Sequence, residues 1–320
     1  MRPDIVAIVG PTASGKSAAA IEAAKALNGE VLSMDSMQIY ERLTIGTAKP
    51  SEQELSEVPH HLLSYVNPEK AYCVSDYQTD ARRTMEEVLE RGKLPVFCGG
   101  TGLYLQAVSH PIRFTDAQPD MEVREELFRL AQTQEGVLEL YERLRKADPV
   151  YAAKMHPNDT RRVIRALEVW QTTGIPFSMQ QNDWNEEPQE NWHIYGIRWE
   201  REHLIQRINE RVDAMMTMGL EEEVRGLLKS GMLPASQAMQ AIGYKELAEA
   251  VLGHCTVGEA VNLIKQRTRQ YAKRQMTWYR RNTDIIWFDA EQYPSAKNLQ
   301  QAMLQQIRMD LKNSQTGKEE

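Results

Sequence analysis

The sequence predicts an α/β fold in which a parallel sheet of the P-loop type is flanked by helices and carries an inserted all-helical domain. Three observations lead to this class. The segment GPTASGKS follows a short apolar run and precedes an alanine-rich stretch. Strand and helix signals alternate over the first third of the chain. Between residues 113 and 190 strand signals vanish, and the stretches with helical periodicity are MEVREELFRLAQ, VLELYERLRKA and TRRVIRALEVWQTTG.

The first third of the chain is predicted to form three strands and two helices. The strands are Ile5 to Val9, Glu30 to Met34 and Pro95 to Cys98. The helices are Ser14 to Leu27, which Asn28-Gly29 ends, and Ser75 to about Arg91, which opens on a capping-box pattern. Strands that alternate with helices favour parallel pairing through right-handed crossovers.

After the helical insertion the chain returns to strand character. A strand is predicted at Trp192 to Trp199 and another at Ile285 to Phe288. Between them we expect the helices Arg201 to Met218, Leu220 to Lys229, Tyr244 to Leu252 and Val257 to about Arg281. We therefore expect a core of residues 1–112 and 191–312, an inserted domain of residues 113–190, and a disordered tail of residues 313–320.

The composition is that of a folded protein, because 42% of the residues are hydrophobic and 26% are charged. No apolar run approaches the roughly 18 residues of a membrane span, so we expect no membrane partner. Three widely spaced cysteines form no CxxC pair, which favours free thiols and a cytoplasmic location. The net charge of −7 argues against non-specific coating of nucleic acid but leaves room for a local basic face. We expect a monomer.

The segment GPTASGKS fits the phosphate-binding pattern GxxxxGK[ST] between a predicted strand and a predicted helix. Glycines let backbone N–H groups surround oxyanions, and the helix N-terminus and a lysine add positive charge. The candidate residues are Gly10, Pro11, Thr12, Ala13, Ser14, Gly15, Lys16 and Ser17, with the Ser17 hydroxyl as a ligand for Mg²⁺. ATP or GTP is the usual inference, but the loop requires only a di- or triphosphate, so the reaction stays open.

Two further loops follow predicted strands and should open onto the same crevice, since ligands of open α/β sheets bind beyond the carboxyl ends of the strands. Asp35 follows the second strand and is either a water-mediated Mg²⁺ ligand, a general base or a turn-capping residue. Beside it, Gln38 carries an amide that can read an adenine edge. The GGTG segment presents the Thr101 hydroxyl, or is a tight turn that merely needs glycines.

Residues 261–283 contain seven Lys and Arg residues and no Asp or Glu. Arg267, Arg274 and Arg281 are seven residues apart and share a helical face, with aromatic residues interleaved, which suits phosphate tracking with base stacking. The alternative is a solvated helix face. A second basic cluster comprises Arg161, Arg162 and Arg165. Arg207 and Arg211 are four residues apart and either clamp phosphate or pair with acidic neighbours such as Glu210.

Taken together, the motifs resemble the bacterial tRNA dimethylallyltransferase family, also called tRNA isopentenyltransferase. The segments that carry the resemblance occur in order from residue 10 to about residue 281: GPTASGKS, MDSMQIY, IGTAKP, FCGGTGLYL, HPNDTRRVIRALEV, IGYKEL and TRQYAKRQMTWYR. Ser17 stands where many relatives have Thr, and both can ligate Mg²⁺. The zinc-finger extension of eukaryotic members is missing from this sequence.

The resemblance implies transfer of the dimethylallyl group from dimethylallyl diphosphate to the exocyclic amine (N6) of the adenosine 3′ of the anticodon. Asp35 is then the general base with Thr101 beside it. Lys16, Ser17 with Mg²⁺, and Arg207 stabilise the diphosphate leaving group. The implied tRNA contacts are Asp35, Ser36, Met37, Gln38, Thr101, Arg161, Arg162, Arg165, Gln240, Gly243, Tyr244, Lys245, Lys273, Arg274, Trp278 and Arg280.

Two other classes of function remain to be weighed. A P-loop kinase for small molecules or nucleotides explains the phosphate loop and Asp35 but leaves the basic, aromatic-bearing helix unexplained. An RNA-binding NTPase should hydrolyse nucleotide in the presence of RNA.

Overall fold

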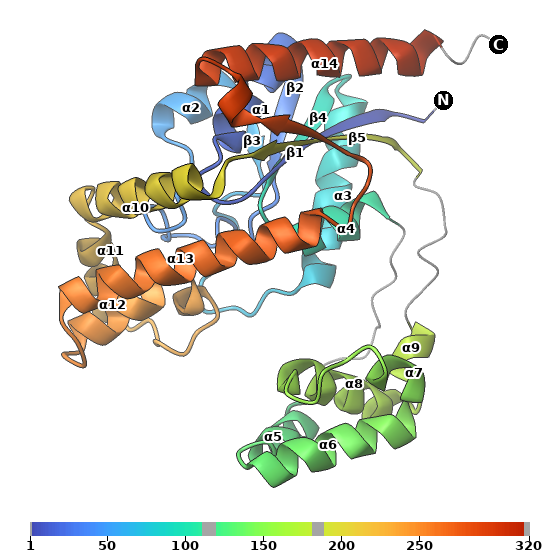
Figure 1. The fold of residues 1–320 in the computed structure, drawn as a ribbon, viewed down its shortest axis with the longest axis vertical. Coiled ribbons are helices and arrows are strands. Elements are labelled where there is room, and N and C mark those ends of the chain that lie inside the picture. Colours follow the sequence, from blue (N-terminus) through green and yellow to red (C-terminus); the bar gives the residue numbers. More distant parts are fainter. Residues whose placement is uncertain (1, 111–119, 181–188, 317–320) are drawn as a thin grey trace. The chain divides into compact units, whose positions relative to one another are not determined.

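A computed structural model describes residues 2–110, 120–180 and 189–316; residues 1, 111–119, 181–188 and 317–320 lie outside the described part (Figure 1). The described strands are β1 (Asp4–Val9), β2 (Gly29–Ser33), β3 (His60–His61), β4 (Leu94–Gly99), β5 (Asn191–Arg198) and β6 (Ile285–Asp289). They form one parallel sheet in the order β3-β2-β4-β1-β5-β6. This arrangement confirms the predicted fold class.

The helices of the core flank this sheet. They are α1 (Lys16–Ala26), α2 (Glu52–Glu57), α3 (Val74–Glu90), α4 (Gly102–Ser109), α10 (Arg201–Thr217), α11 (Leu220–Lys229), α12 (Tyr244–Val251), α13 (Val257–Tyr279) and α14 (Ala296–Thr316). Two short 3₁₀ helices are η1 (Ala238–Gln240) and η2 (Ala290–Gln292). Among the described helices, none has both the length and the apolar character that a membrane crossing requires.

The two faces of the sheet bury different cores, because side chains alternate along a strand. Ile5, Ala7 and Val9 of β1 pack into a core that includes side chains of α3, α4 and α12. Val6 and Ile8 point the other way and pack with α1 and α14. Figure 1 shows the orange helix α13 and the red helix α14 on opposite faces of the sheet.

The register of the strands brings three strand ends to one edge of the sheet. Val9 at the end of β1 pairs with Gly99 at the end of β4, and Ser33 at the end of β2 pairs with Cys98. The phosphate loop, the loop at Asp35 and the GGTG segment therefore begin side by side, as expected for an open parallel sheet.

Helix α14 was not predicted, and it corrects the expectation of a disordered tail from residue 313. The helix continues to Thr316. Leu299, Met303 and Ile307 are spaced four residues apart and are at most 5% exposed, so burial of one face stabilises the helix. Near its end the Ser314 hydroxyl lies 3.3 Å from Nε2 of His193 and donates to the Asp310 carbonyl. The rest of the expected tail, residues 317–320, lies outside the described residues.

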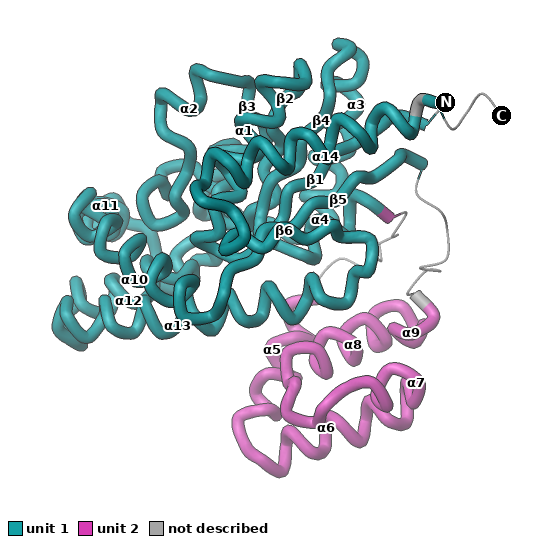
Figure 2. The backbone as a smooth tube through the Cα atoms, turned by 45° about the horizontal axis from the view of Figure 1, so that its top comes forward, with its two compact units in different colours: residues 1–109, 188–320 teal, residues 110–187 magenta. Residues whose placement is uncertain are grey.

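The chain divides into two compact units, which Figure 2 colours separately: residues 1–109 with 188–320, and residues 110–187. The sequence placed these limits at residues 113 and 190. The second unit contains α5 (Met121–Leu130), α6 (Gln134–Ala147), α7 (Pro149–Ala152), α8 (Thr160–Thr173) and α9 (Phe177–Gln180). It has a core of its own, in which Leu127, Leu144 and Leu167 are buried.

Candidate active site

The phosphate loop turns sharply between β1 and α1. Gly10 has φ 152° and Gly15 has φ 93°, conformations that glycine adopts without steric cost. A Cβ at residue 10 would lie 2.7 Å from the carbonyl oxygen of Ile197, so a larger residue does not fit there. Ala13 also has a positive φ, of 64°. The loop thus depends on its neighbours to hold an unusual backbone shape.

Three side chains from distant parts of the core hold this loop. Arg207 Nε donates to the Ala13 carbonyl over 2.8 Å, and its guanidinium lies 4.3 Å from the ring centre of Trp199. Trp199 Nε1 donates to the Ser14 carbonyl over 3.0 Å. The Thr12 amide donates to Oε1 of Gln275 over 2.9 Å. These contacts fix the outer part of the loop at three successive residues.

Asp35 serves as a turn-capping residue in this structure. Its Oδ1 accepts from the backbone amides of Met37, over 2.8 Å, and Gln38, over 3.3 Å. The next amide, of Ser36, donates to Oγ1 of Thr101 over 3.3 Å. The Asp35 loop and the GGTG segment are therefore joined directly, and Asp35 and Thr101 are neighbours as the sequence predicted. Both capping bonds use Oδ1 of the carboxylate.

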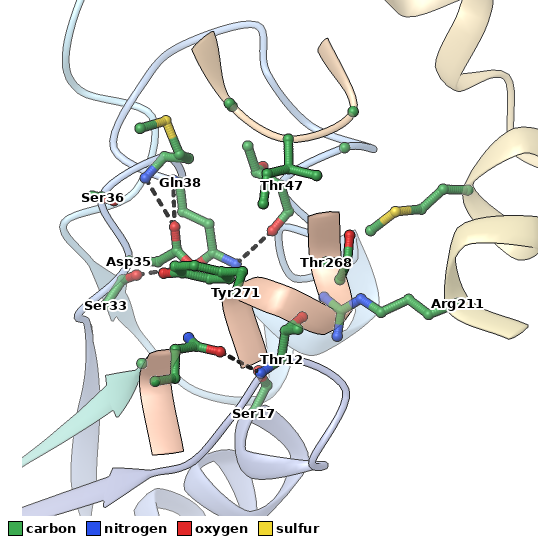
Figure 3. A pocket seen from close by; sticks show the side chains of 18 of the residues that line it. Thr12, Ser17, Ser33, Asp35, Ser36, Gln38, Thr47, Arg211, Thr268 and Tyr271 are labelled. Carbon is green, nitrogen blue, oxygen red and sulfur yellow. Dashed lines mark hydrogen bonds between the residues drawn. The ribbon is translucent and has the colours of Figure 1, made fainter. Parts of the chain in front are cut away.

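A cavity of about 340 Å³ extends from the phosphate loop to this pair of loops and is lined by Thr12, Lys16, Ser17 and Asp35 at its polar end. Figure 3 shows Asp35, Tyr271 and Thr12 together, with Arg211 reaching in from α10. Part of the remaining wall is apolar and is formed by Ile208, Val212, Met215, Leu220, Ile242 and Ile264, whereas Thr47, His60 and Thr268 are among its polar residues. The cavity therefore offers a cationic end and an apolar wall to the same ligand.

The charges at the polar end favour an anion. Burial lowers the pKa of Lys16, and the nearby positive charge of Arg211 lowers it further, whereas Asp35 raises it. Burial is also the main cause that lowers the pKa of Arg211. Lys16 Nζ donates to the Pro11 carbonyl over 3.2 Å. Because two cations lie partly desolvated in one place, binding of a phosphate group there would relieve their repulsion.

The structure brings ten of the 25 predicted site residues to the lining of this cavity. Those that line it are Thr12, Lys16, Ser17, Asp35, Ser36, Met37, Gln38, Gln240, Gly243 and Arg274. Gln38 is held inside the protein, because its Oε1 accepts from the Ser33 hydroxyl and its Nε2 donates to the carbonyls of Thr47 and Ala48. Its amide group faces the protein in this structure, so adenine readout by Gln38 requires a rearrangement.

Tyr244 corrects a predicted tRNA contact. The side chain is 0% exposed. Its hydroxyl donates to Glu223 and accepts from the Gly46 amide. Tyr244 therefore belongs to the core and fixes the loop that contains IGTAKP, whereas its neighbour Lys245 is exposed. The sequence could not separate the two roles of Tyr244, because an aromatic residue between a glycine and a lysine occurs both in protein cores and on binding surfaces.

Of the three arginines predicted as a cluster in the inserted unit, one pairs with a buried carboxylate inside that unit. Glu168 is 1% exposed, and it accepts from Nε and Nη2 of Arg124 and pairs with Arg165 over 3.2 Å. Arg165 therefore compensates a buried carboxylate. Arg162 pairs with the half-buried Asp159, and both Arg161 and Arg162 are exposed. Only these two present themselves at the surface as RNA contacts would.

Helix α13 is likewise divided between structural and exposed cations. Lys265 pairs with Asp213 over 2.6 Å, Arg267 pairs with the buried Glu246, and Arg269 donates to Asn209. The exposed cations are Lys273 and Arg274 on the helix and Arg280 and Arg281 directly after it, and the Arg274 guanidinium lies 5.7 Å from the ring centre of Tyr271. Trp278 is half-buried, and a Cβ at Gly102 would meet its ring at 2.1 Å. The basic face is thus concentrated in the second half of the helix.

Two residues of the site, Gln275 and Tyr271, were not among the predicted site residues, although Tyr271 is one of the aromatic residues that suggested base stacking. Gln275 bonds to the phosphate loop, and Tyr271 lines the cavity. The two are four residues apart, and Tyr279 follows four residues later with its hydroxyl donating to the Gly99 carbonyl over 3.3 Å. This spacing marks one helical face, which could have been recognised as the face turned to the sheet. The described residues contain no group of three or more His, Cys, Asp or Glu suited to a metal ion.

Comparison with known proteins confirms the resemblance. The family model for IPP transferase matches residues 38–282, and that for isopentenyl transferase matches residues 3–66. The tRNA dimethylallyltransferase of Bacillus pumilus (strain SAFR-032) is 46% identical over 285 residues, which cover 89% of each chain. The enzyme of the same name from Carboxydothermus hydrogenoformans is 47% identical over 291 residues, 91% of this chain and 93% of that one.

Solved structures give the same result. The full-length tRNA isopentenylpyrophosphate transferase from Bacillus halodurans aligns over 100% of both chains with a TM-score of 0.75 and 39% identity. A eukaryotic dimethylallyltransferase acting on tRNA aligns over 90% of this chain and 74% of its own, with a TM-score of 0.76 and 31% identity.

Proposed function

The chain belongs to the IPP transferase family, and we propose that it is a tRNA dimethylallyltransferase. It transfers the dimethylallyl group of dimethylallyl diphosphate to N6 of the adenosine 3′ of the anticodon and releases diphosphate. The observation that carries this proposal is the cavity itself, in which a phosphate loop and a carboxylate lie at one end and a group of apolar side chains forms part of the remaining wall.

The polar end of the cavity suits a departing diphosphate. Breaking the allylic C–O bond leaves the bonding electron pair on the diphosphate, so donors placed around it lower the barrier. Lys16 and Arg211 supply positive charge there, and the amides at the start of α1 supply oriented N–H groups. Arg207 is bonded to the loop itself. In this role the loop stabilises a leaving group, and no nucleotide is hydrolysed.

The carboxylate of Asp35 suits the other half of the reaction. The adenine N6 forms a bond to C1 of the dimethylallyl group as the C–O bond breaks, and one N6 proton must then leave. Asp35 lines the cavity and is held in place by the amides of Met37 and Gln38. We assign this proton to Asp35 as general base. Thr101, which accepts a hydrogen bond from the Ser36 amide, would position the amine.

The residues present fit Mg²⁺ as a cofactor. Ser17 is an exposed residue in the first turn of α1 and lines the cavity. Mg²⁺ is commonly held by one or two protein oxygens together with substrate phosphates and water, which a single hydroxyl beside a diphosphate can satisfy. When bound, the ion supplies further neutralisation of the leaving group.

The exposed cations of α13 suit the tRNA. Lys273, Arg274 and Arg280 can contact phosphates of a single-stranded loop, and Arg274 also lines the cavity where the adenosine must enter. Extrusion of a base from its stack costs a few kcal/mol, which such contacts offset. Gln240, Lys245, Arg161 and Arg162 are further exposed candidates. The proposal includes action as a cytoplasmic monomer, in keeping with three free cysteines.

The test is a transfer assay with radiolabelled dimethylallyl diphosphate, Mg²⁺ and a tRNA that carries adenosine 3′ of the anticodon. A matched tRNA with guanosine at that position is the control. We expect label in the adenosine tRNA alone. Absence of transfer, with ATP consumed when small-molecule acceptors are added, would instead support a kinase, and RNA-stimulated nucleotide hydrolysis would support an NTPase.

A further inference from the structure

Gln275 bonds to two of the loops that form the cavity. Its Oε1 accepts from the Thr12 amide over 2.9 Å, and its Nε2 donates to the Gly100 carbonyl over 2.8 Å. The side chain is 6% exposed. One buried amide on α13 therefore ties the phosphate loop to the GGTG segment.

Residue 100 is matched to this amide. A Cβ at Gly100 would lie 2.0 Å from Nε2 of Gln275 and 3.6 Å from the carbonyl oxygen of Gly10. Glycine therefore leaves the space that the amide occupies, and the two loops lie against each other at this point. Any side chain at residue 100 would displace the Gln275 amide.

The two loops hold different halves of the reaction. The phosphate loop carries Lys16 and Ser17, whereas the GGTG segment carries Thr101, which bonds to the Asp35 loop. A small shift between them would change the distance from the leaving group to the base. Misplacement of reacting groups by about 1 Å can cost about a hundredfold in rate.

We propose that Gln275 is a positioning residue that sets the phosphate loop against the Thr101 loop through these two hydrogen bonds. The inference rests on the proposed transfer reaction. It also separates Gln275 from its neighbours Lys273 and Arg274, which are exposed on the same helix. Gln275 is buried and lines the cavity, and in this role it acts through the two loops that it bonds to.

Three substitutions break or restore the bridge. Gln275→Met keeps the length of the side chain and removes both hydrogen bonds. Gly100→Ala displaces the amide from the opposite side. Gln275→Glu restores both bonds only when its carboxyl is protonated, because the neutral acid has one O–H donor and one carbonyl acceptor. Gln266→Met, at an exposed position of the same helix, is the matched control.

We expect Gln275→Met to lower kcat of transfer about 10- to 100-fold, with the Kd for an anticodon stem-loop RNA changed less than about twofold. Gly100→Ala should act similarly, and the double variant should be little worse than either single one, since both break one interaction. The activity of Gln275→Glu relative to the wild-type protein at the same pH should rise as the pH falls, while the ratio for Gln275→Met stays flat.

Binding of inorganic diphosphate, measured by calorimetry with Mg²⁺, provides a readout that does not need transfer. We expect Gln275→Met to weaken diphosphate binding about tenfold, because the Thr12 amide of the phosphate loop loses the hydrogen bond that holds it in place. The proposal would be overturned if Gln275→Met transferred the dimethylallyl group and bound diphosphate as well as the wild-type protein does. It would also be overturned if the variant lost RNA affinity by the same factor as it lost kcat. If the wild-type protein transfers nothing, the proposed function fails, and the diphosphate measurement still decides the role of Gln275.

Discussion

Arg207 on helix α10 donates a hydrogen bond from Nε to the backbone carbonyl of Ala13 over 2.8 Å. Ala13 has φ 64°, a left-handed conformation that is uncommon for alanine. The guanidinium that makes this bond also lies over the ring of Trp199. The helix therefore restrains the phosphate loop at the residue where its backbone is least relaxed.

Arg207→Lys should lower kcat/KM for dimethylallyl diphosphate about 10- to 100-fold, because an ammonium cannot bond to the carbonyl and stack on the indole with the same planar geometry. Steady-state kinetics with saturating tRNA measure this. Arg201→Lys, at an exposed position of the same helix, is the control and should match the wild-type protein. If the two variants had equal kinetics, the contact of Arg207 with the phosphate loop would not contribute to the reaction.

Asp35→Asn should lower the rate of transfer about 10²- to 10⁴-fold, the contribution of a general base. The asparagine retains an oxygen that can accept from the amides of Met37 and Gln38, so the turn should persist. The affinity for tRNA should then stay within about twofold. Single-turnover transfer and filter binding measure the two quantities. Near-normal transfer by the variant would exclude Asp35 as the base.

Ser17→Ala should raise the Mg²⁺ concentration needed for half-maximal transfer and lower kcat about tenfold, since the protein loses its oxygen ligand. Ser17→Thr keeps the hydroxyl and should behave like the wild-type protein. Titration with Mg²⁺ after removal of metal by EDTA distinguishes them. An identical Mg²⁺ dependence for the alanine and threonine variants would contradict a role of this hydroxyl.

Arg274→Ala should weaken tRNA binding and reduce the slope of log Kd against log salt by about 1, because one phosphate contact releases its counterion. Fluorescence anisotropy over a range of KCl concentrations gives the slope. Tyr244→Phe is a useful comparison, since it removes buried hydrogen bonds to Glu223 and Gly46. It should cost about 1–2 kcal/mol of stability but leave the slope unchanged. If the salt dependence of tRNA binding changed in Tyr244→Phe and not in Arg274→Ala, the assignment of Arg274 to the tRNA contact and of Tyr244 to the core would be wrong.

Glu30 should contribute stability that depends on acid pH. The hydrogen bond from Arg91 is the main cause that lowers the pKa of Glu30 below its ordinary value of 4.5, and His61 contributes as well. A carboxyl with a lowered folded-state pKa stabilises the protein above pH 4.5, and this stabilisation is lost as the pH falls through the lower value. Urea unfolding should therefore show a difference between wild type and Glu30→Gln that shrinks below this pH.

The matched control for this measurement is Glu86→Gln, at an exposed position of helix α3. Its difference from the wild-type protein should be small at every pH. A difference for Glu30→Gln that stays constant from pH 7 to strongly acid conditions would contradict the ion pair as its source.

Local patterns in the sequence were sufficient for the sheet and its loops. GPTASGKS between an apolar run and an alanine-rich stretch predicted a strand, a phosphate loop and a helix, and the structure has them at Asp4–Val9 and Lys16–Ala26. Strand ends at one edge then placed Asp35 near Thr101. These features depend on residues close in the sequence and on the geometry of parallel sheets.

Contacts between distant residues were beyond such patterns. Thr12 and Gln275 are 263 positions apart, and nothing near either residue indicates their hydrogen bond. The burial of Tyr244 and the pairing of Arg165 with Glu168 likewise depend on how helices pack. Sequence patterns identified cationic and aromatic residues of the correct type, but only packing decides which of them face the solvent.

The most direct test of the account is mass spectrometry of nucleosides from tRNA incubated with the wild-type protein, Mg²⁺ and dimethylallyl diphosphate, with released diphosphate measured in parallel. The account predicts adenosine that carries one dimethylallyl group on N6, with one diphosphate released for each modified tRNA. Unmodified adenosine together with nucleotide-dependent release of phosphate would contradict it.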